Sequence, residues 1–288
     1  MEPLYPATPE EIGPWRKRHG VPADEARKRF MQYVVLESIA SAPGLAHSIA
    51  FKGGNALRFV YGNRRSTLDL DFTADGPFPD DAEQIRARLD EALRSALPRY
   101  RVKARCQRLR RNPPGHDKVR PTYDISVGYL LPGDRQYNNF EEQKSVASTI
   151  DVEISINEVV CEAVLHRLTP AGPELRVCAL EDIVAEKLRA LLQQPIRRRS
   201  RPQDVYDIAS IIRRLGDGLD LAKVALYLIR KAEARDIRPR KSGFDATVRG
   251  LASYSYEAEI RPKAPEFIPF EEAWSVVTDL VSRLGIPD

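Results

Sequence analysis

Two aspartates separated by one residue, Asp69 and Asp71, are the side chains whose types and spacing most directly indicate chemistry. They follow a double glycine, Gly53-Gly54. In a strand over residues 67–72 both carboxylates point to one face, while the alternating apolar residues, Leu68 among them, face the core. Carboxylate oxygens are ligands that Mg²⁺ prefers, and glycine lets backbone N–H groups approach phosphate oxygens. The pattern therefore predicts a divalent metal held against a nucleoside triphosphate.

Both features also occur without such a function. Glycine pairs mark ordinary turns, and the two aspartates could be exposed strand residues paired with Arg64 or Arg65. The double glycine is not a Walker loop, because no Gly-Lys-Ser or Gly-Lys-Thr follows it. Its place between a predicted strand, 48–51, and a predicted helix, 55–61, favours the phosphate-binding interpretation.

A third carboxylate would strengthen a metal site, and one later strand offers two. Residues 149–156 alternate strictly between apolar and polar side chains, so Asp151 and Glu153 share a face. From the residues alone, either could join the two aspartates. Two or three carboxylates suffice for Mg²⁺, because it shares its coordination sphere with substrate phosphates.

A lysine in the second half of the chain falls where an apolar residue is expected. On a helix over residues 180–193, Lys187 lies inside the apolar stripe, and Asp204 does the same on a helix over 203–215. A lysine on the core side is costly unless it is paired or functional, although its ammonium could also extend from the edge of the stripe to water. The two residues could be partners or could both line a cleft, and Asp207 could orient either.

Strands predominate in the first half of the chain and helices in the second, which predicts an α+β fold with a mixed sheet. Proline and glycine interrupt residues 169–173, where we place a boundary between a first domain, 1–169, and a helical domain, 170–288. A segment rich in proline and charge, 108–121, is predicted to be a loop, and Pro98 to end the helix before it. The remaining predicted strands are 100–106, 123–131 and 159–165, the last as a neighbour of strand 149–156; the remaining predicted helices are 24–42, 85–97, 219–234, 244–253 and 271–284.

The composition is that of a chain that folds unaided. It has 288 residues, of which 42% are hydrophobic, and the three cysteines show no CxxC spacing that would indicate a zinc site or a disulfide framework. No signal-peptide pattern opens the chain and no segment is apolar enough for a membrane span, so we expect a cytoplasmic protein without a membrane partner.

Basic residues are clustered, although the 45 basic and 41 acidic side chains nearly balance. A charge run is usually a solvated face, but several runs around one site would suit the phosphate backbone of RNA. Tyr100, Tyr123 and Tyr129 could stack on a terminal base or simply pack in the core. The basic clusters are Arg101, Lys103 and Arg105 with Arg108, Arg110 and Arg111; residues 197–201; and Arg235, Arg238, Arg240 and Lys241.

Five motifs in this order resemble those of the AbiEii-type nucleotidyltransferase toxins, which include the mycobacterial MenT toxins. Each motif is modest alone, but the ordered set, over residues from about 50 to 208, is specific. The matching segments are Lys52-Gly53-Gly54-Asn55-Ala56-Leu57, residues 65–72 around the two aspartates, Val152-Glu153-Ile154-Ser155, residues 180–188 around Lys187, and residues 201–208 around Asp204.

The resemblance implies a polymerase-beta-type nucleotidyltransferase core followed by a helical C-terminal domain. It implies that Asp69 and Asp71 bind Mg²⁺ or Mn²⁺, that Lys187 and Asp204 complete the active site, and that Glu153 rather than Asp151 is the third carboxylate. The nucleotide contacts that we predict are Gly53, Gly54, Lys52, Arg65 and Thr67.

Toxins of this family belong to bacterial toxin–antitoxin pairs, and some add nucleotides to tRNA acceptor stems. The resemblance therefore implies a Mg²⁺-dependent enzyme that transfers NMP from an NTP to an RNA 3′ end, blocks translation and growth, and has a cognate antitoxin. Two alternatives remain open: transfer to a protein or small molecule, and a nucleotide-binding or RNA-binding protein without turnover.

Overall fold

The computed structural model describes residues 5–114 and 120–288, which form two compact units. Unit 1 comprises Met1–Val60, Leu68–Glu158 and Val164–Val177, and unit 2 comprises Tyr61–Thr67, Val159–Ala163 and Cys178–Asp288. The sequence predicts a boundary after residue 169, whereas the compact units place residues 61–67 and 159–163 with the helical part and residues 164–177 with the first.

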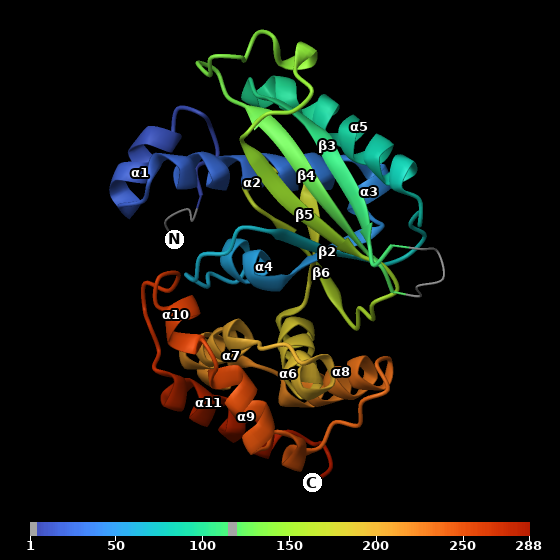
Figure 1. Cartoon of the computed structure of the whole chain (residues 1–288), viewed down its shortest axis with the longest axis vertical. Helices are drawn as coiled ribbons and strands as arrows, with labels where there is room; N and C mark the ends of the chain where they lie inside the picture. Colours follow the sequence, from blue (N-terminus) through green and yellow to red (C-terminus); the bar gives the residue numbers. More distant parts are fainter. Residues whose placement is uncertain (1–4, 115–119) are drawn as a thin grey trace. The chain divides into compact units, whose positions relative to one another are not determined.

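Unit 1 is built on a seven-stranded mixed sheet with the strand order β3-β4-β5-β2-β1-β7-β6 (Figure 1). The pair β1–β2 is antiparallel, whereas β2–β5 and β1–β7 are parallel. This arrangement confirms the predicted α+β class with a mixed sheet. The strands are β1 (Ile49–Lys52), β2 (Leu70–Ala74), β3 (Lys103–Asn112), β4 (Thr122–Leu130), β5 (Thr149–Ser155), β6 (Ala163–Arg167) and β7 (Glu174–Cys178).

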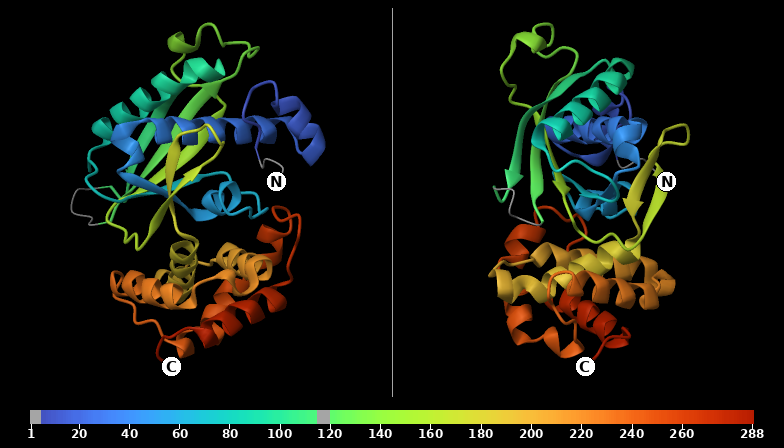
Figure 2. Two further views of the ribbon diagram at one scale, coloured as in Figure 1. Left: turned by 180° about the vertical axis from the view of Figure 1, so that it is seen from behind. Right: turned by 90° about the vertical axis from the view of Figure 1, so that its right-hand side faces the viewer.

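Helices cover one face of this sheet. Figures 1 and 2 show α2 (Ala23–Ser41) and α5 (Ala82–Tyr100) layered on the same side. One row of register partners, Phe51, Phe72, Ile154 and Tyr123, is almost completely buried, as expected for the face that packs against helices. The other described helices of unit 1 are α1 (Ile12–His19), α3 (Pro43–Ala46), α4 (Gly53–Phe59) and the 3₁₀ turn Phe140–Glu142.

Three sequence predictions in unit 1 are wrong. Helix α5 continues past Pro98 to Tyr100. A proline in the last turn removes only one backbone hydrogen bond, which the helix tolerates there, and the helix ends at Arg101, whose φ is 52°. Residues 108–112 belong to β3, since they pair with β4, and residues 115–119 of the predicted loop lie outside the described residues. The strand predicted over 159–165 is not a neighbour of β5; β6 lies at the sheet edge beside β7, which the sequence did not predict.

Unit 2 is helical, as predicted. Helix α6 packs on α7, α8 and α9, and α7 packs on α10 and α11. A buried ion pair of 2.9 Å joins Lys231 on α8 to Asp182 on α6. No helix in the described ranges is both long and apolar enough to cross a membrane. The helices are α6 (Leu180–Arg197), α7 (Pro202–Leu215), α8 (Leu221–Glu233), α9 (Ala246–Ser253), α10 (Tyr256–Ile260) and α11 (Phe270–Arg283), with 3₁₀ turns at Gly216–Gly218 and Lys241–Gly243.

The aromatic pair Phe51 and Phe72 should be a main source of stability in unit 1. Both are 0% exposed, and their ring centroids lie 5.2 Å apart across β1 and β2. We expect Phe72→Ala to lower the free energy of unfolding by about 3–5 kcal/mol, because it leaves a cavity in a packed layer. Urea denaturation measures this. Leu165→Ala on β6, where the side chain is 59% exposed, is the control and should change stability by less than about 0.5 kcal/mol.

Candidate functional site

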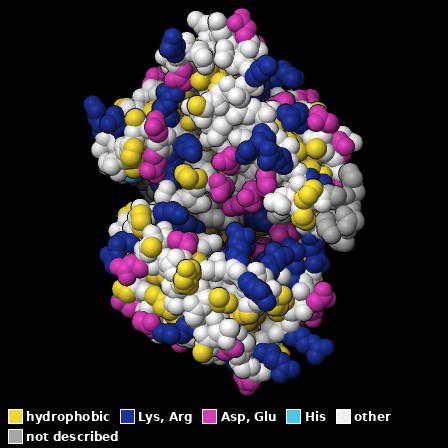
Figure 3. All heavy atoms as spheres, in the orientation of Figure 1, with side chains coloured by type: hydrophobic (Ala, Val, Ile, Leu, Met, Phe, Trp, Pro, Cys, Tyr) yellow, Lys and Arg dark blue, Asp and Glu magenta, His cyan; other side chains and the backbone are white. Residues whose placement is uncertain are grey.

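The register of β2 between its two neighbours creates a row of charged side chains on the sheet face opposite α2 and α5. Lys52 on β1 is the partner of Asp71 on β2, and Asp71 is the partner of Glu153 on β5. The row continues to Asp124 on β4 and Arg110 on β3. Register partners point to the same face, so three carboxylates lie side by side between two basic residues. Figure 3 shows acidic side chains gathered over β4 and β5, with Lys and Arg beside them.

The double glycine lies directly against this row. Helix α4 begins at Gly53, immediately after β1, and Gly53 has φ +73°. A Cβ atom there would lie only 2.1 Å from Oδ2 of Asp71. Glycine is therefore required twice, by the left-handed backbone and by the carboxylate that lies over the turn. Gly54 is the second residue of α4. The glycine turn and the Asp71 carboxylate thus lie against each other within unit 1.

Asp69 is not part of the strand, so the predicted strand over 67–72 is wrong at its start. β2 begins at Leu70, and Leu68 is 52% exposed instead of facing the core. The backbone carbonyls of Leu68 and Asp69 accept hydrogen bonds from the side-chain amides of Gln32 and Asn55, each at 2.7 Å. These amides bind the backbone just before the strand begins. The Asp69 side chain is exposed.

Glu153 is placed better than Asp151 to act with Asp71. Glu153 is the direct register partner of Asp71, whereas Asp151 lies one step further along the same face, opposite Ser126. Among the described residues, no group of three or more His, Cys, Asp or Glu side chains is gathered closely enough to hold a metal ion by itself. Hard carboxylate oxygens in this arrangement suit Mg²⁺ or Mn²⁺, which complete their coordination with water and substrate phosphates.

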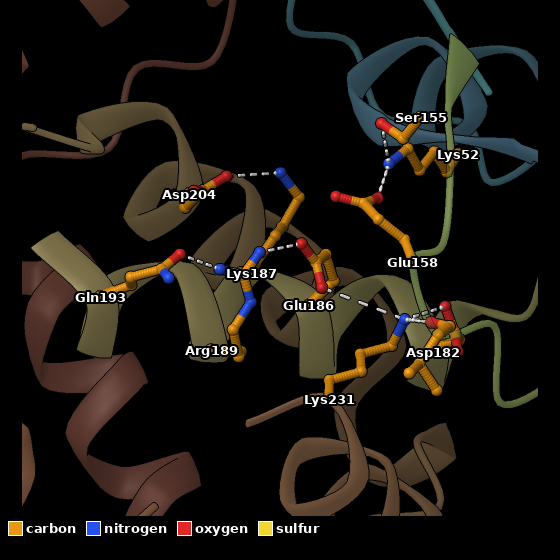
Figure 4. Close-up of polar contacts among 11 residues, drawn as sticks. Lys52, Ser155, Glu158, Asp182, Glu186, Lys187, Arg189, Gln193, Asp204 and Lys231 are labelled. Atoms are coloured by element: carbon orange, nitrogen blue, oxygen red, sulfur yellow. Dashed lines mark hydrogen bonds and ion pairs between the residues drawn. The ribbon is translucent and has the colours of Figure 1, made fainter. Parts of the chain in front are cut away.

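Lys52 also reaches into this polar face. Its ammonium donates to Oγ of Ser155 at 3.2 Å and forms an ion pair with Glu158 just beyond β5 (Figure 4). Lys52 therefore has a fixed position beside Asp71, as a predicted phosphate contact requires. Sequence reasoning missed Glu158, because the residue follows the strand and belongs to none of the recognised motifs.

In unit 2, Lys187 and Asp204 are partners, which is one of the two arrangements that the sequence left open. Lys187 is 6% exposed, and its Nζ lies 2.8 Å from Oδ1 of Asp204 (Figure 4). The same Nζ lies 2.8 Å from Oδ2 of Asp207. Burial alone would lower the pKa of Lys187, but the two carboxylates outweigh it and hold that pKa above its ordinary value. The lysine is thus a buried ammonium rather than a side chain that extends to water.

Asp207 is the centre of this cluster. It is 0% exposed, and its two oxygens accept Nε and Nη2 of Arg65, each at 2.7 Å. Asn63 donates to Oδ1 of Asp207 at 3.2 Å. Burial would raise the pKa of Asp207, but Arg65 and Lys187 lower it to about 2. In the sequence, Asp207 follows Asp204 by three residues, a spacing that puts the two side chains on one face of a helix. This spacing is the sequence feature that indicates Asp207 as a second partner of Lys187.

The segment that precedes Asp69 in the sequence is fixed within unit 2. Arg65 is 7% exposed and bound to Asp207, and the backbone N–H of Ser66 donates to the carbonyl of Lys263 at 2.7 Å. Thr67 is half-buried at the end of this segment. The predicted contacts of Arg65 and Thr67 with the nucleotide stay predictions. In this structure the Arg65 side chain binds and orients the Asp207 carboxylate.

Two of the basic clusters contain exposed arginines, whereas the tyrosines considered for base stacking are buried. Arg197, Arg198 and Arg199 at the end of α6 are exposed, as are Arg108 and Arg110 on β3. The tyrosines proposed to stack on a base are buried, with Tyr100, Tyr123 and Tyr129 at most 4% exposed, so they pack in the core instead.

Gly53→Ala should cost about 1–2 kcal/mol of stability, because alanine is strained at φ +73° and its methyl group would displace the Asp71 carboxylate. Equilibrium urea denaturation measures the change. The matched control is Gly44→Ala in α3, where a Cβ meets nothing within 4 Å. If the two variants lose equal stability, the turn does not require glycine.

Asp207→Asn should lower the free energy of unfolding at pH 7 by about 3–5 kcal/mol, because it leaves Arg65 and Lys187 buried without their shared anion. The pKa of Asp207 falls from 3.8 to about 2 on folding, so its charge stabilises the protein above pH 3.8 and loses this effect as the pH falls through about 2. The difference between wild type and variant should therefore shrink by roughly 2 kcal/mol between pH 5 and pH 2. A constant difference in denaturation experiments across this range would refute the pairing.

Comparison with known proteins finds a matching family. A family model described as "Nucleotidyl transferase AbiEii toxin, Type IV TA system" matches residues 34–277. No curated protein matches the chain.

Three solved structures share the fold. MenT4, a nucleotidyltransferase toxin from Mycobacterium tuberculosis H37Rv, is 17% identical with a TM-score of 0.53, over 95% of this chain and 98% of MenT4. A putative nucleotidyltransferase from Helicobacter pylori is 13% identical with a TM-score of 0.51, over 91% of this chain and 95% of its own. JHP933 from Helicobacter pylori is also 13% identical, with a TM-score of 0.52 over 91% of each chain. At these identities the structures show the fold, and the family model, which matches most of the sequence, shows the family: this chain belongs to the AbiEii nucleotidyl transferase toxins of type IV toxin–antitoxin systems.

Proposed function

We propose that this toxin transfers a nucleoside monophosphate from a nucleoside triphosphate to the 3′ end of an RNA, with the tRNA acceptor stem as the acceptor. The observation that carries the proposal is the row Lys52, Asp71 and Glu153, with the Asp71 carboxylate lying over the Gly53 turn. A glycine turn that accepts phosphates beside two adjacent carboxylates is the minimum that nucleotidyl transfer needs. The exposed arginines on β3 and at the end of α6 support a polyanionic acceptor.

Asp69 and Asp71 would hold Mg²⁺ or Mn²⁺, with Glu153, or Asp151 as the alternative, as the third carboxylate. Such an ion would offset negative charge on the triphosphate and on the leaving pyrophosphate. Backbone N–H groups of the turn at Gly53-Gly54 bind the phosphate tail, and the Lys52 ammonium neutralises part of its charge.

The reaction forms one bond and breaks one. The RNA 3′ oxygen bonds to the α-phosphorus, the bond between that phosphorus and the bridging oxygen of the β-phosphate breaks, and pyrophosphate leaves. Glu153, or Asp151 in its place, orients the attacking hydroxyl and accepts its proton. Lys187 is the proposed phosphate-binding cation of the reaction, and Asp204 and Asp207 keep that lysine protonated and in position.

The test is incubation of the folded protein with Mg²⁺, each of the four α-labelled nucleoside triphosphates and total tRNA, followed by gel separation of RNA from protein. We expect label in RNA with at least one nucleotide. Asp69→Ala and Lys187→Ala should each lower the rate by about 100- to 1,000-fold, because the first removes a ligand of the metal ion and the second removes a phosphate-binding cation. Leu165→Ala is the control and should retain full activity.

Two outcomes would contradict the proposal. Label that enters protein or a small molecule but no RNA would show a different acceptor. Absence of transfer to any acceptor, with triphosphate binding retained in Asp69→Ala, would indicate a protein that binds nucleotide or RNA without turnover. Raising the salt concentration should weaken RNA binding steeply if the exposed arginines contact the phosphate backbone.

A further inference from the structure

A buried arginine connects helix α2 to the aspartate segment of unit 1. Arg29 is 1% exposed. Its Nη1 donates to Oε1 of Gln32 at 2.9 Å and to Oδ1 of Asn55 at 3.2 Å, and its Nη2 lies 3.4 Å from a carboxylate oxygen of Glu25. One guanidinium therefore binds the side-chain oxygens of two amides, one on α2 and one on α4.

Both amides use their other end on the backbone of the aspartate segment. Nε2 of Gln32 donates to the carbonyl of Leu68, and Nδ2 of Asn55 donates to the carbonyl of Asp69, each at 2.7 Å. Gln32 and Asn55 are both 0% exposed. The contacts thus form two parallel chains that start from one guanidinium and end on consecutive peptide groups.

The direction of these hydrogen bonds is fixed by chemistry. A guanidinium only donates and a backbone carbonyl only accepts, so each amide must turn its oxygen to Arg29 and its NH₂ group to the carbonyl. Rotating either amide by half a turn would face donor to donor and acceptor to acceptor at a buried position, which is costly. Burial, reinforced by Arg58, lowers the pKa of Arg29 to about 10, which still leaves the guanidinium protonated at neutral pH.

These contacts matter because Asp69 lies just before β2. The register of β2 with β5 begins at Leu70, one residue later. The carbonyl groups of Leu68 and Asp69 accept hydrogen bonds from the amides that Arg29 orients.

We infer that Arg29 is a positioning residue for Asp69: through Gln32 and Asn55 it fixes the backbone from which the Asp69 carboxylate binds the divalent metal. This inference rests on the proposed function, since it needs Asp69 to be a metal ligand. Arg29 itself touches neither the metal nor the nucleotide. Its effect is on metal affinity, through the placement of one ligand.

The test compares Mn²⁺ binding, measured by the electron paramagnetic resonance signal of free Mn²⁺, in wild type and Asn55→Asp. The variant keeps the size of the side chain and its pairing with Arg29, but it turns a carboxylate oxygen toward the Asp69 carbonyl. We expect Mn²⁺ affinity to fall about 10- to 100-fold, the usual effect of changing a group that orients a metal ligand. Asn138→Asp, which adds the same charge at an exposed position, is the matched control and should bind Mn²⁺ as wild type does.

Further variants separate positioning from a general loss of structure. Gln32→Met removes the second amide without adding charge and should weaken Mn²⁺ binding in the same direction, which keeps the test valid if Asn55→Asp does not fold. Arg29→Lys retains the charge but supplies one donor group and should bind Mn²⁺ with intermediate affinity. In the transfer assay, the Mg²⁺ concentration for half-maximal rate should rise in these variants while the rate at saturating Mg²⁺ recovers in part.

The outcomes distinguish this inference from the proposed function. If wild type binds no Mn²⁺, or Asp69→Ala binds it as well as wild type, Asp69 is not a metal ligand and the proposed function fails. If Asp69→Ala loses Mn²⁺ but folded Asn55→Asp and Gln32→Met bind it with wild-type affinity, the proposed function stands and the positioning role of Arg29 is wrong.

Discussion

The pairing register of β2 with β1 and β5 is the constraint on which the site in unit 1 depends. It aligns Lys52, Asp71 and Glu153 in one row across three strands. Side chains alternate along a strand, so a slip of β2 by one residue would turn Asp71 toward the helices and remove Phe72 from its contact with Phe51. Burying those phenylalanines under α2 and α5 therefore does more than stabilise the sheet. It also fixes which face carries the carboxylates, and it places Asp71 over the glycine turn that follows Lys52.

Unit 2 obeys a different constraint, the cost of burying charge. Asp207 is removed from water and remains ionised only because Arg65 and Lys187 surround it. Such a cluster contributes little net stability when complete, but it is strongly destabilising when one member is lost. The cluster fixes the Lys187 side chain, because a lysine held by two carboxylates keeps both its charge and its direction. A surface lysine on a flexible stem would have neither.

The sequence predicted well what depends on periodicity. Alternation in residues 149–156 predicted β5, and the apolar stripe of α6 singled out Lys187, for which a partnership with Asp204 was one of the alternatives. Prediction from the sequence failed where contacts join segments that are far apart in the chain. The start of β2 was misplaced because Gln32 and Asn55, from two other elements, hold the carbonyls of Leu68 and Asp69. The residues alone did not show that Glu153 rather than Asp151 is the register partner of Asp71, because this depends on how β2 pairs with β5. The positions of β6 and β7 depend on a parallel pairing of β7 with β1 that no local pattern encodes.

The most direct measurement is a crystal structure of the protein with Mn²⁺ and a non-hydrolysable nucleoside triphosphate, in which anomalous scattering locates the metal. If Asp69 and Asp71 are the metal ligands, the Mn²⁺ peak will lie within coordination distance of both carboxylates, with the triphosphate against the Gly53-Gly54 turn. A bound triphosphate whose Mn²⁺ lies away from these two aspartates would contradict the central claim.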